Sequence, residues 1–376
     1  MSETSGDIRA VTVPKWGLAM EEGTLTAWLA GEGETIAKGQ ELAEIESTKI
    51  ANVLESPAAG VLRRQVAQPG QVLPVGALLG VIAPAGVPDA DIDAFVAGFV
   101  VDPPDEEGAE AGLAEGEAAG ARGPIAYKAA NPRAEAVPAI LVHGFGGDSD
   151  NFMFNIEALA ADRPVYAIDL PGHGRSAKTL GSGDMAELAG AILALMDAVE
   201  APRAHLVGHS LGAAACFEVA SQAPARVASL AGVAPAGLGP TVNDAYISGF
   251  LAAERRKDVK AALQMLFADP DLVSAAMIEG VLRALRLDGA REALSAIAAA
   301  TLPGGSQARS YRAMLDATPI RTLVLWGERD AILPPEQGEG LPASVRLVRI
   351  PAVGHMPHME AAALVNEQLA AHFAAG

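Results

Sequence analysis

The strongest chemical signature in the sequence is a serine held between two glycines. Residues 208–212 read Gly-His-Ser-Leu-Gly and follow the apolar run 205–207 directly. Such a serine sits on a turn between a strand and a helix, which projects its hydroxyl clear of the backbone, and the glycines avoid collisions in the turn. The helix that follows points its first amides, including that of Leu211, at the reaction centre. We therefore expect Ser210 to be a nucleophile.

A serine nucleophile needs a base and a group that orients the base. Asp330 ends the segment 327–330 (Gly-Glu-Arg-Asp) after an apolar run, and His355 follows Gly354 after the apolar run 347–350. The chain order of serine, acid and histidine is typical of a Ser-His-Asp triad at the ends of parallel strands. We expect His355 to accept the Ser210 proton and Asp330 to fix the tautomer of the imidazole. His358 is a weaker alternative base, since no glycine precedes it.

A second glycine-rich loop supplies the other group that this chemistry needs. Residues 143–147 (His-Gly-Phe-Gly-Gly) follow the apolar run 139–142. We expect the Phe145 amide to join the Leu211 amide as an oxyanion donor. His143 and His173 are expected to support loops, and His209 is expected to point away from its neighbour Ser210. We expect no metal site.

These residues must be positioned by a sheet of short buried strands. Apolar runs bounded by turns lie at 139–142, 165–168, 205–207, 227–233 and 322–326. Helical patterns separate them, notably at 185–199 and 211–220, which predicts a mostly parallel sheet with helices on both faces. Residues 241–317 interrupt this alternation and read as helical. We expect them to form a cap over the sheet edge where ligands bind.

The first part of the chain has a different pattern. Residues 8–83 read as short strands separated by Gly and Pro turns, as in a small all-β domain with two similar halves. Lys49 lies near the junction of the halves, ten residues after Gly39 and eleven before Gly60. A lysine exposed on such a turn can be modified by a ligase and then swing between sites. An unmodified lysine is the plain alternative.

Between these regions the composition changes. Residues 89–99 have the spacing of one short amphipathic helix. Residues 102–122 are rich in acids, Ala and Gly, and such a segment buries too little apolar surface to order itself. We predict domains at 1–83 and 125–376, joined at 84–124 by a short helix and a flexible linker that is disordered over 100–122.

Two family resemblances follow from these motifs. Residues 137–373 resemble the α/β-hydrolase superfamily through the loops 143–147 and 169–176, the Gly-His-Ser-Leu-Gly turn, the Gly-Glu-Arg-Asp segment and the late Gly-His. The region around Lys49 resembles the lipoyl domains of 2-oxo acid dehydrogenase acyltransferases. Glu46 matches that pattern, while Ser47, Thr48 and Ile50 depart from it. A biotin site, the other alternative, would have Met on both sides of the lysine.

The combination of one lipoyl domain with one α/β-hydrolase domain resembles the acetyltransferase components of acetoin dehydrogenase complexes. That resemblance implies dihydrolipoyllysine-residue acetyltransferase activity, with lipoate covalently bound to Lys49 and coenzyme A as co-substrate. It also implies a multienzyme complex with a thiamine-diphosphate-dependent acetoin dehydrogenase component and dihydrolipoamide dehydrogenase, in which the chain is oligomeric. A lipoate ligase would attach the lipoate to Lys49. The trimeric acyltransferase signature His-x-x-x-Asp-Gly does not occur.

Composition excludes several other classes. A net charge of −19 argues against binding to nucleic acid or to an anionic membrane surface. The longest uncharged run lies near residues 72–88, but its prolines and glycines rule out a continuous membrane helix. With the single Cys216 and no basic, apolar leader, we expect a cytoplasmic protein. Two alternative functions stay open: a hydrolase (esterase, thioesterase or C–C bond hydrolase), and a lipoyl carrier or scaffold with an idle triad.

Overall fold

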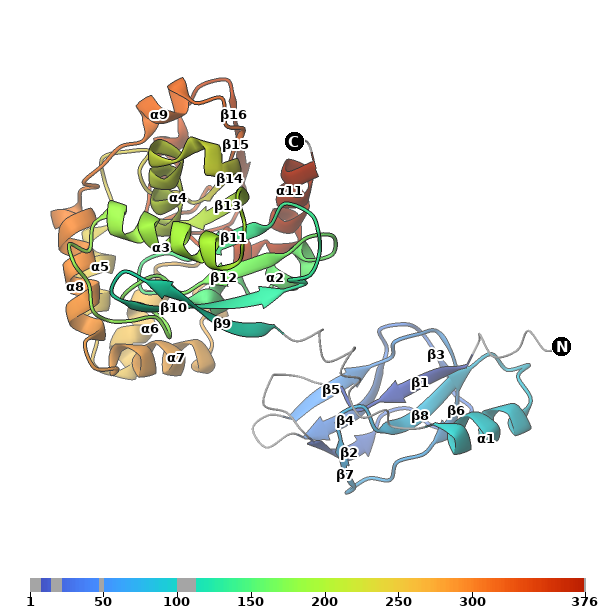
Figure 1. The fold of residues 1–376 in the computed structure, drawn as a ribbon. Helices are drawn as coiled ribbons and strands as arrows, with labels where there is room; N and C mark the ends of the chain where they lie inside the picture. The colour runs from blue at the N-terminus through green and yellow to red at the C-terminus, as the bar shows by residue number, and fades with distance from the viewer. Residues whose placement is uncertain (1–7, 15–21, 47–50, 100–112, 375–376) are drawn as a thin grey trace. The chain divides into compact units, whose positions relative to one another are not determined.

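The computed structural model describes residues 8–14, 22–46, 51–99 and 113–374 (Figure 1). The chain divides into two compact units, Met1–Gly112 and Leu113–Gly376. Each unit has a hydrophobic core of its own. Among the described residues, no helix combines the length and the hydropathy that a bilayer crossing requires.

The first unit contains two antiparallel sheets. One has the order β1 (Arg9–Thr12), β8 (Leu78–Ala83), β6 (Gly60–Gln65) and β3 (Thr35–Ile36), and the other the order β5 (Ala51–Glu55), β4 (Glu41–Glu46), β2 (Glu22–Trp28) and β7 (Val72–Pro74). Alternate residues of these strands point inward, so that Leu25, Leu42, Ile45, Leu62 and Leu79 are almost completely buried. The small all-β domain predicted from the sequence is confirmed.

The acidic helix expected at 89–99 belongs to this first unit. Helix α1 (Asp89–Gly98) buries Ile92 in a cluster with Val81 and other residues of the sheet. Arg63 of β6 binds Asp89 at 2.7 Å, and its guanidinium also donates to backbone carbonyls ahead of the helix. The helix is therefore anchored to the β-domain, whereas the sequence assigned it to the connection between domains.

The second unit is built on one mixed sheet. Its order is β16 (Val345–Ile350), β15 (Thr322–Gly327), β14 (Val227–Val233), β13 (Ala204–His209), β11 (Ala139–Val142), β12 (Val165–Ile168), β10 (Gly123–Ala130) and β9 (Ala114–Gly120). Pairs from β12 to β16 are parallel, and β10 is antiparallel to both neighbours. Parallel strands bring their carboxyl ends to one edge, where loops can converge on a site.

Helices cover both faces of this sheet (Figure 1). Helices α3 (Met185–Ala198) and α4 (Leu211–Gln222) pack in one core cluster, while α2 (Ile156–Leu159) and α11 (Ala362–Ala374) pack in the other. The predicted α/β architecture is confirmed. The insertion expected at 241–317 contains α5 (Asp244–Ala252), α6 (Arg256–Gln264), α7 (Ala275–Leu285), α8 (Ala290–Thr301) and α9 (Arg312–Ala317), all between β14 and β15.

Part of the segment predicted to be disordered forms a strand. Strand β9, which was expected to be disordered, pairs with β10 from Gly120 opposite Gly123 to Ala114 opposite Ala129. Its inward positions are small, because a Cβ on Gly116 would lie 2.4 Å from the Tyr127 ring. Its acids, Glu115 and Glu117, are exposed at alternate positions, as in a strand. The period-2 pattern was not apparent in the sequence because the inward positions are Gly and Ala, which give no apolar signal. Residues 100–112 of the predicted linker lie outside the described residues.

This pairing predicts the start of the second folding unit. A fragment of residues 113–376 should unfold at the same temperature as the second unit of the whole chain. A fragment of residues 125–376 loses β9, which pairs with β10 and packs against α3, and should unfold several degrees lower, at about 2–4 °C for each kcal/mol lost. Calorimetry of both fragments measures this, and equal transition temperatures would contradict the pairing.

Candidate active site

Ser210 occupies a strained turn between β13 and α4. Its backbone has φ 51° and ψ −116°, a conformation that costs about 1–3 kcal/mol in a residue with a side chain. The neighbouring glycines allow it, because a Cβ on Gly208 would lie 2.3 Å from the Ala213 Cα. A Cβ on Gly212 would lie 2.3 Å from the Val142 carbonyl oxygen. Strand, turn and helix thus meet in backbone contact, with Ser210 at the end of the central strand.

Asp330 and His355 form a buried hydrogen-bonded pair. His355 Nδ1 lies 2.8 Å from Asp330 Oδ2, and the Asp330 side chain has no solvent exposure. That carboxylate also accepts bonds from Trp326 Nε1 at 3.0 Å and from the amides of Ile332 at 2.8 Å and Leu333 at 3.0 Å. Several donors make a buried carboxylate tolerable. Asp330 is therefore fixed, and its bond to Nδ1 leaves His355 Nε2 free to act as a base.

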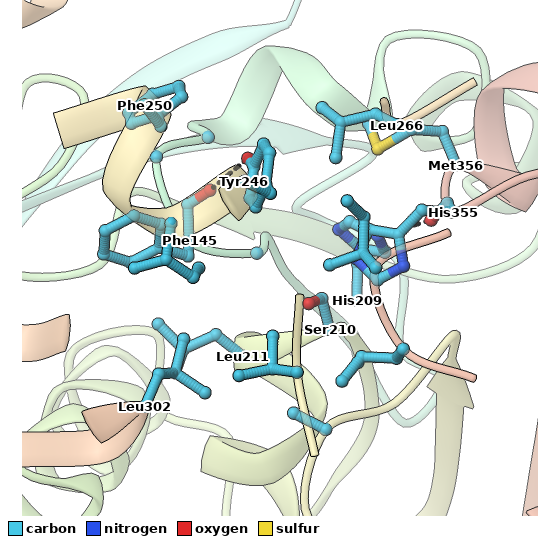
Figure 2. Close-up of a pocket in the computed structure, with 18 of the residues that line it drawn as sticks. Phe145, His209, Ser210, Leu211, Tyr246, Phe250, Leu266, Leu302, His355 and Met356 are labelled. Carbon is cyan, nitrogen blue, oxygen red and sulfur yellow. Dashed lines mark hydrogen bonds between the residues drawn. The ribbon is translucent and has the colours of Figure 1, made fainter. Parts of the chain in front are cut away.

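Ser210 and His355 line the same pocket (Figure 2). The walls are mainly apolar side chains from the cap and from the loops at the sheet edge, among them Val242, Ile247, Phe250, Leu263, Leu266, Leu302 and Met356. In the described part of the chain no hydrogen bond joins the Ser210 hydroxyl to the His355 imidazole. Such bonds often tighten only when substrate is bound. The structure therefore brings the three predicted triad residues together, two of them in direct contact.

The predicted oxyanion donors also reach this pocket. Phe145 and Leu211 both line it, and among the described residues neither amide donates a hydrogen bond to another protein group. Leu211 is the first residue of α4, where helix amides have no intrahelical acceptor. The Phe145 loop is pressed against the turn, since a Cβ on Gly144 would lie 2.7 Å from His209 Nδ1. Two free amides beside a serine can hold a developing oxyanion.

His143 and His173 are loop supports, as expected. His143 accepts a hydrogen bond from the Leu170 amide at Nε2, at 3.0 Å, and Nδ1 lies 2.8 Å from the Gly144 carbonyl. His173 Nδ1 lies 3.0 Å from the Pro171 carbonyl. Burial lowers the pKa of both imidazoles, so both remain neutral. Their hydrogen bonds hold the two glycine-rich loops in place.

His209 has a role that sequence reasoning missed. Its Nε2 donates to the His355 carbonyl oxygen at 2.8 Å, and the two rings lie 4.8 Å apart. The residue beside the nucleophile thus supports the backbone of the predicted base. Burial lowers the pKa of His209 well below its ordinary value, which keeps it neutral. The two residues are 146 positions apart, and no local motif signals such a contact.

His358, the alternative base, is not joined to an acid. Its side chain is completely buried, and among the described residues neither ring nitrogen has a hydrogen-bond partner. The ring lies between Phe152, at 4.9 Å, and His209, at 4.6 Å, and burial lowers its pKa to about 3. The geometry therefore favours His355 as the base, and His358 serves as an aromatic side chain of the core.

Lys49, the predicted attachment site, lies outside the described residues. The strands on either side of it are described: β4 and β5 pair antiparallel, with Glu46 opposite Ala51. Glu44 and Glu46 are exposed on β4. The segment that contains Lys49 therefore connects two paired strands, as a presented lysine requires.

The buried histidines predict how stability depends on pH. His205 and His372 have pKa values of about 4 and His358 of about 3, lowered by burial from 6.5. Below about pH 6.5 these histidines are protonated in the unfolded chain but stay neutral in the folded chain. The free energy of unfolding therefore decreases as the pH falls from 6.5 towards the pKa values of the folded state. His358→Phe removes one such group. The loss between pH 6 and pH 5 should therefore become shallower by about 1.4 kcal/mol per pH unit.

Urea unfolding at several pH values measures that slope, and an unchanged slope would show that His358 is protonated in the folded chain. The same variant tests the choice of base. A serine-directed phosphonate should still label Ser210 in His358→Phe, whereas His355→Phe should abolish labelling.

Comparisons with known proteins agree with both halves of the structure. Residues 138–362 match the sequence model of the alpha/beta hydrolase fold, and residues 9–82 match a model described as biotin-requiring enzyme. A meta-cleavage product hydrolase from Pseudomonas fluorescens IP01 is a structural neighbour, with a TM-score of 0.62, 22% identity, and coverage of 69% of this chain and 97% of its own. At that identity the likeness shows the fold alone.

Two curated relatives match along nearly the whole chain. The dihydrolipoyllysine-residue acetyltransferase component of the acetoin cleaving system from Pseudomonas putida is 45% identical over 97% of this chain and 98% of its own length. The component of the same name from Cupriavidus necator is 43% identical over 99% of both. A pimeloyl-[acyl-carrier protein] methyl ester esterase from Neisseria meningitidis is 31% identical over 58% of this chain and 86% of its own. The chain belongs to the family of dihydrolipoyllysine-residue acetyltransferase components of acetoin cleaving systems.

Proposed function

We propose that this acetyltransferase moves an acetyl group from a lipoyl arm on Lys49 to coenzyme A through an acetyl-Ser210 intermediate. One observation carries the proposal. His355, hydrogen-bonded to Asp330, and the strained Ser210 turn line one apolar pocket. They do so in a chain that aligns end to end with acetyltransferase components.

The described part of the first unit fits a lipoyl carrier. Antiparallel β4 and β5 meet at the pair Glu46–Ala51 on either side of the Lys49 segment. The family model that matches residues 9–82 also supports a carrier domain. A lipoyl group on Lys49 would carry the acetyl group as a thioester. The residues of the second unit supply the rest of the chemistry.

In the first step His355 Nε2 accepts the proton of the Ser210 hydroxyl while Oγ attacks the thioester carbonyl carbon. The Phe145 and Leu211 amides hold the oxyanion, and Asp330 stabilises the imidazolium. When the carbon–sulfur bond breaks, His355 returns the proton to the leaving thiolate. The acetyl group is then an ester on Ser210.

In the second step the coenzyme A thiol gives its proton to His355 Nε2, and its sulfur attacks the acetyl-Ser210 carbonyl. The carbon–oxygen bond breaks, Ser210 Oγ regains the proton, and acetyl-coenzyme A leaves. Water competes with the thiol for the same ester. The apolar pocket walls, such as Leu266 and Leu302, favour the thiol by excluding water.

The same proposal names the partners. A thiamine-diphosphate-dependent acetoin dehydrogenase component would load the arm, and dihydrolipoamide dehydrogenase would reoxidise it. A lipoate ligase would modify Lys49, and the chain would act as an oligomer within the complex. The names of the full-length relatives, which place them in an acetoin cleaving system, support this assignment.

Ser210→Ala should abolish acetyl transfer without unfolding the chain. The change removes one oxygen and leaves the glycines of the turn in place, so the loss should be about 10³-fold or more. Acetyl-coenzyme A formation from acetyl-dihydrolipoamide measures it. Ser248→Ala, an exposed serine on α5, is the matched control and should retain full activity. Near-wild-type transfer in Ser210→Ala would rule out an acyl-serine route.

The product distribution separates the alternatives. A hydrolase would release acetate at the same rate with and without coenzyme A, whereas a transferase should form acetyl-coenzyme A in preference. If the chain were a carrier with an idle triad, neither Ser210→Ala nor Asp330→Asn would change the rate of acetyl-coenzyme A formation. Asp330→Asn should be damaging, because an amide in place of the carboxylate favours the wrong His355 tautomer.

Lys49→Arg should abolish transfer from the chain's own arm only. The intact mass of wild type from lipoate-supplied cells should show one lipoyl addition, which Lys49→Arg lacks and the exposed control Lys38→Arg retains. Free acetyl-dihydrolipoamide should still be a donor for Lys49→Arg, because Ser210 is untouched. A biotin addition, or an unmodified wild type, would overturn the assignment of Lys49.

A further inference from the structure

Glu360 joins two parts of the second unit that are far apart in the sequence. It ends the short helix α10 (Pro357–Glu360), five residues after His355. One carboxylate oxygen, Oε1, accepts hydrogen bonds from the amides of Gly354 at 2.9 Å and Met356 at 3.3 Å. The other, Oε2, accepts from the amide of Ala268 at 2.8 Å. The carboxylate therefore binds both sides of His355 and a segment of the cap.

The two segments are in direct backbone contact. The His355 amide donates to the Leu266 carbonyl oxygen at 2.7 Å. A Cβ on Gly354 would lie 2.6 Å from the Ala268 nitrogen, so only glycine fits there. The loop of the predicted base and the cap segment 266–268 are thus held together along three consecutive residues.

We propose that Glu360 is a positioning residue for His355. It holds the loop of His355 to the cap, so that the imidazole stays in a fixed position relative to the cap residues that line the pocket, which we call the pocket roof. This inference rests on the role proposed for His355. Glu360 does not line the pocket, while Leu266 and Met356, on the two segments that it joins, both do. Figure 2 shows these two side chains beside His355. Glu360 thus acts through backbone geometry, without contact to the substrate.

The hydrogen bonds of His355 explain why a second support is needed. Asp330 fixes the imidazole at Nδ1, and His209 holds the His355 carbonyl. Neither contact reaches the amides of Gly354 and Met356, whose acceptor is Glu360. If this carboxylate were absent and the cap moved, the Leu266 carbonyl would move with the cap. Because the His355 amide is hydrogen-bonded to that carbonyl, His355 would be displaced as well. The carboxylate therefore restrains the base against movement of the cap.

Substitutions of Glu360 test the proposal. Glu360→Gln keeps one oxygen that accepts hydrogen bonds, so it can serve one of the two segments, and Glu360→Ala serves neither. Because a base displaced by about 1 Å can slow an enzyme 10²-fold, kcat should fall about tenfold in Glu360→Gln and about hundredfold in Glu360→Ala. KM for coenzyme A should stay within about twofold. Glu367→Gln, the same change at an exposed acid of α11, is the control and should match wild type.

Activity per active site separates positioning from a merely structural role. Sites are counted by complete labelling with a serine-directed phosphonate, and kcat is divided by that count. Amide exchange should become faster in both 266–268 and 354–356 in Glu360→Ala. If Glu360→Gln has wild-type kcat per labelled site, the proposal is overturned, whatever its melting temperature. If Glu360→Ala fails to fold, Glu360→Gln decides alone.

The two proposals fail in different ways. Loss of the proposed function would appear as a wild-type chain that is not labelled by the phosphonate, or as full transfer activity in Ser210→Ala. Failure of the Glu360 proposal leaves those two results intact and shows wild-type kcat in the Glu360 variants.

Discussion

The active-site edge of the second unit depends on a steric constraint at two glycines. Neither Gly208 nor Gly212 has room for a side chain, because each faces the backbone of another segment at contact distance. Strand β13, helix α4 and the loop after β11 are therefore locked together within a few ångströms. The strained conformation of Ser210 persists because these contacts leave no alternative. Any relaxation of the turn would separate the central strand from the helix that covers it.

A second constraint is electrostatic. Asp330 is a carboxylate without solvent exposure, and it is tolerated because four donors surround it. Three of those donors come from β15 and its own loop, so Asp330 cannot move towards a partner. The loop of His355 must therefore place the imidazole within hydrogen-bond distance of Asp330. The contacts from His209, Leu266 and Glu360 to the loop of His355 bring the imidazole to that fixed point.

The triad candidates were predictable from sequence because their positions are local. Each of Ser210, Asp330 and His355 follows a short apolar strand, and the parallel sheet brings those strand ends to one edge. The small all-β domain and the mostly parallel sheet with helices on both faces were predictable because strand and helix periods are read within a few residues, whereas the lipoyl and α/β-hydrolase families were identified by the resemblance of their motifs. Strand β9 was not, because its inward positions are Gly and Ala and carry no apolar signal.

Contacts between distant segments were also beyond the sequence. The bonds from His209 to His355 and from Glu360 to Ala268 join residues 146 and 92 positions apart. No spacing rule or local motif encodes either bond. Trp326 is a similar case: it reads as one more apolar residue of a strand, yet its indole N–H holds the acid of the triad candidate. Such supporting residues become visible only when the fold is known.

The remaining question is what separates acyl transfer from hydrolysis in a fold that supports both. A Ser-His-Asp set activates water as readily as a thiol, so the set itself does not choose between them. In the proposed mechanism the choice must come from the pocket, which decides what can stand beside an acetyl ester on Ser210. Here residues of the cap form the roof of the pocket. The cap is hydrogen-bonded through Ala268 to Glu360, which also binds the loop of His355. A roof that moved freely would admit water while His355 stayed in place, whereas a roof fixed to His355 admits water only by displacing the base. Under the proposed mechanism, coupling of this kind would let the apolar wall keep water from the acetyl-Ser210 ester while His355 is placed to act as the base.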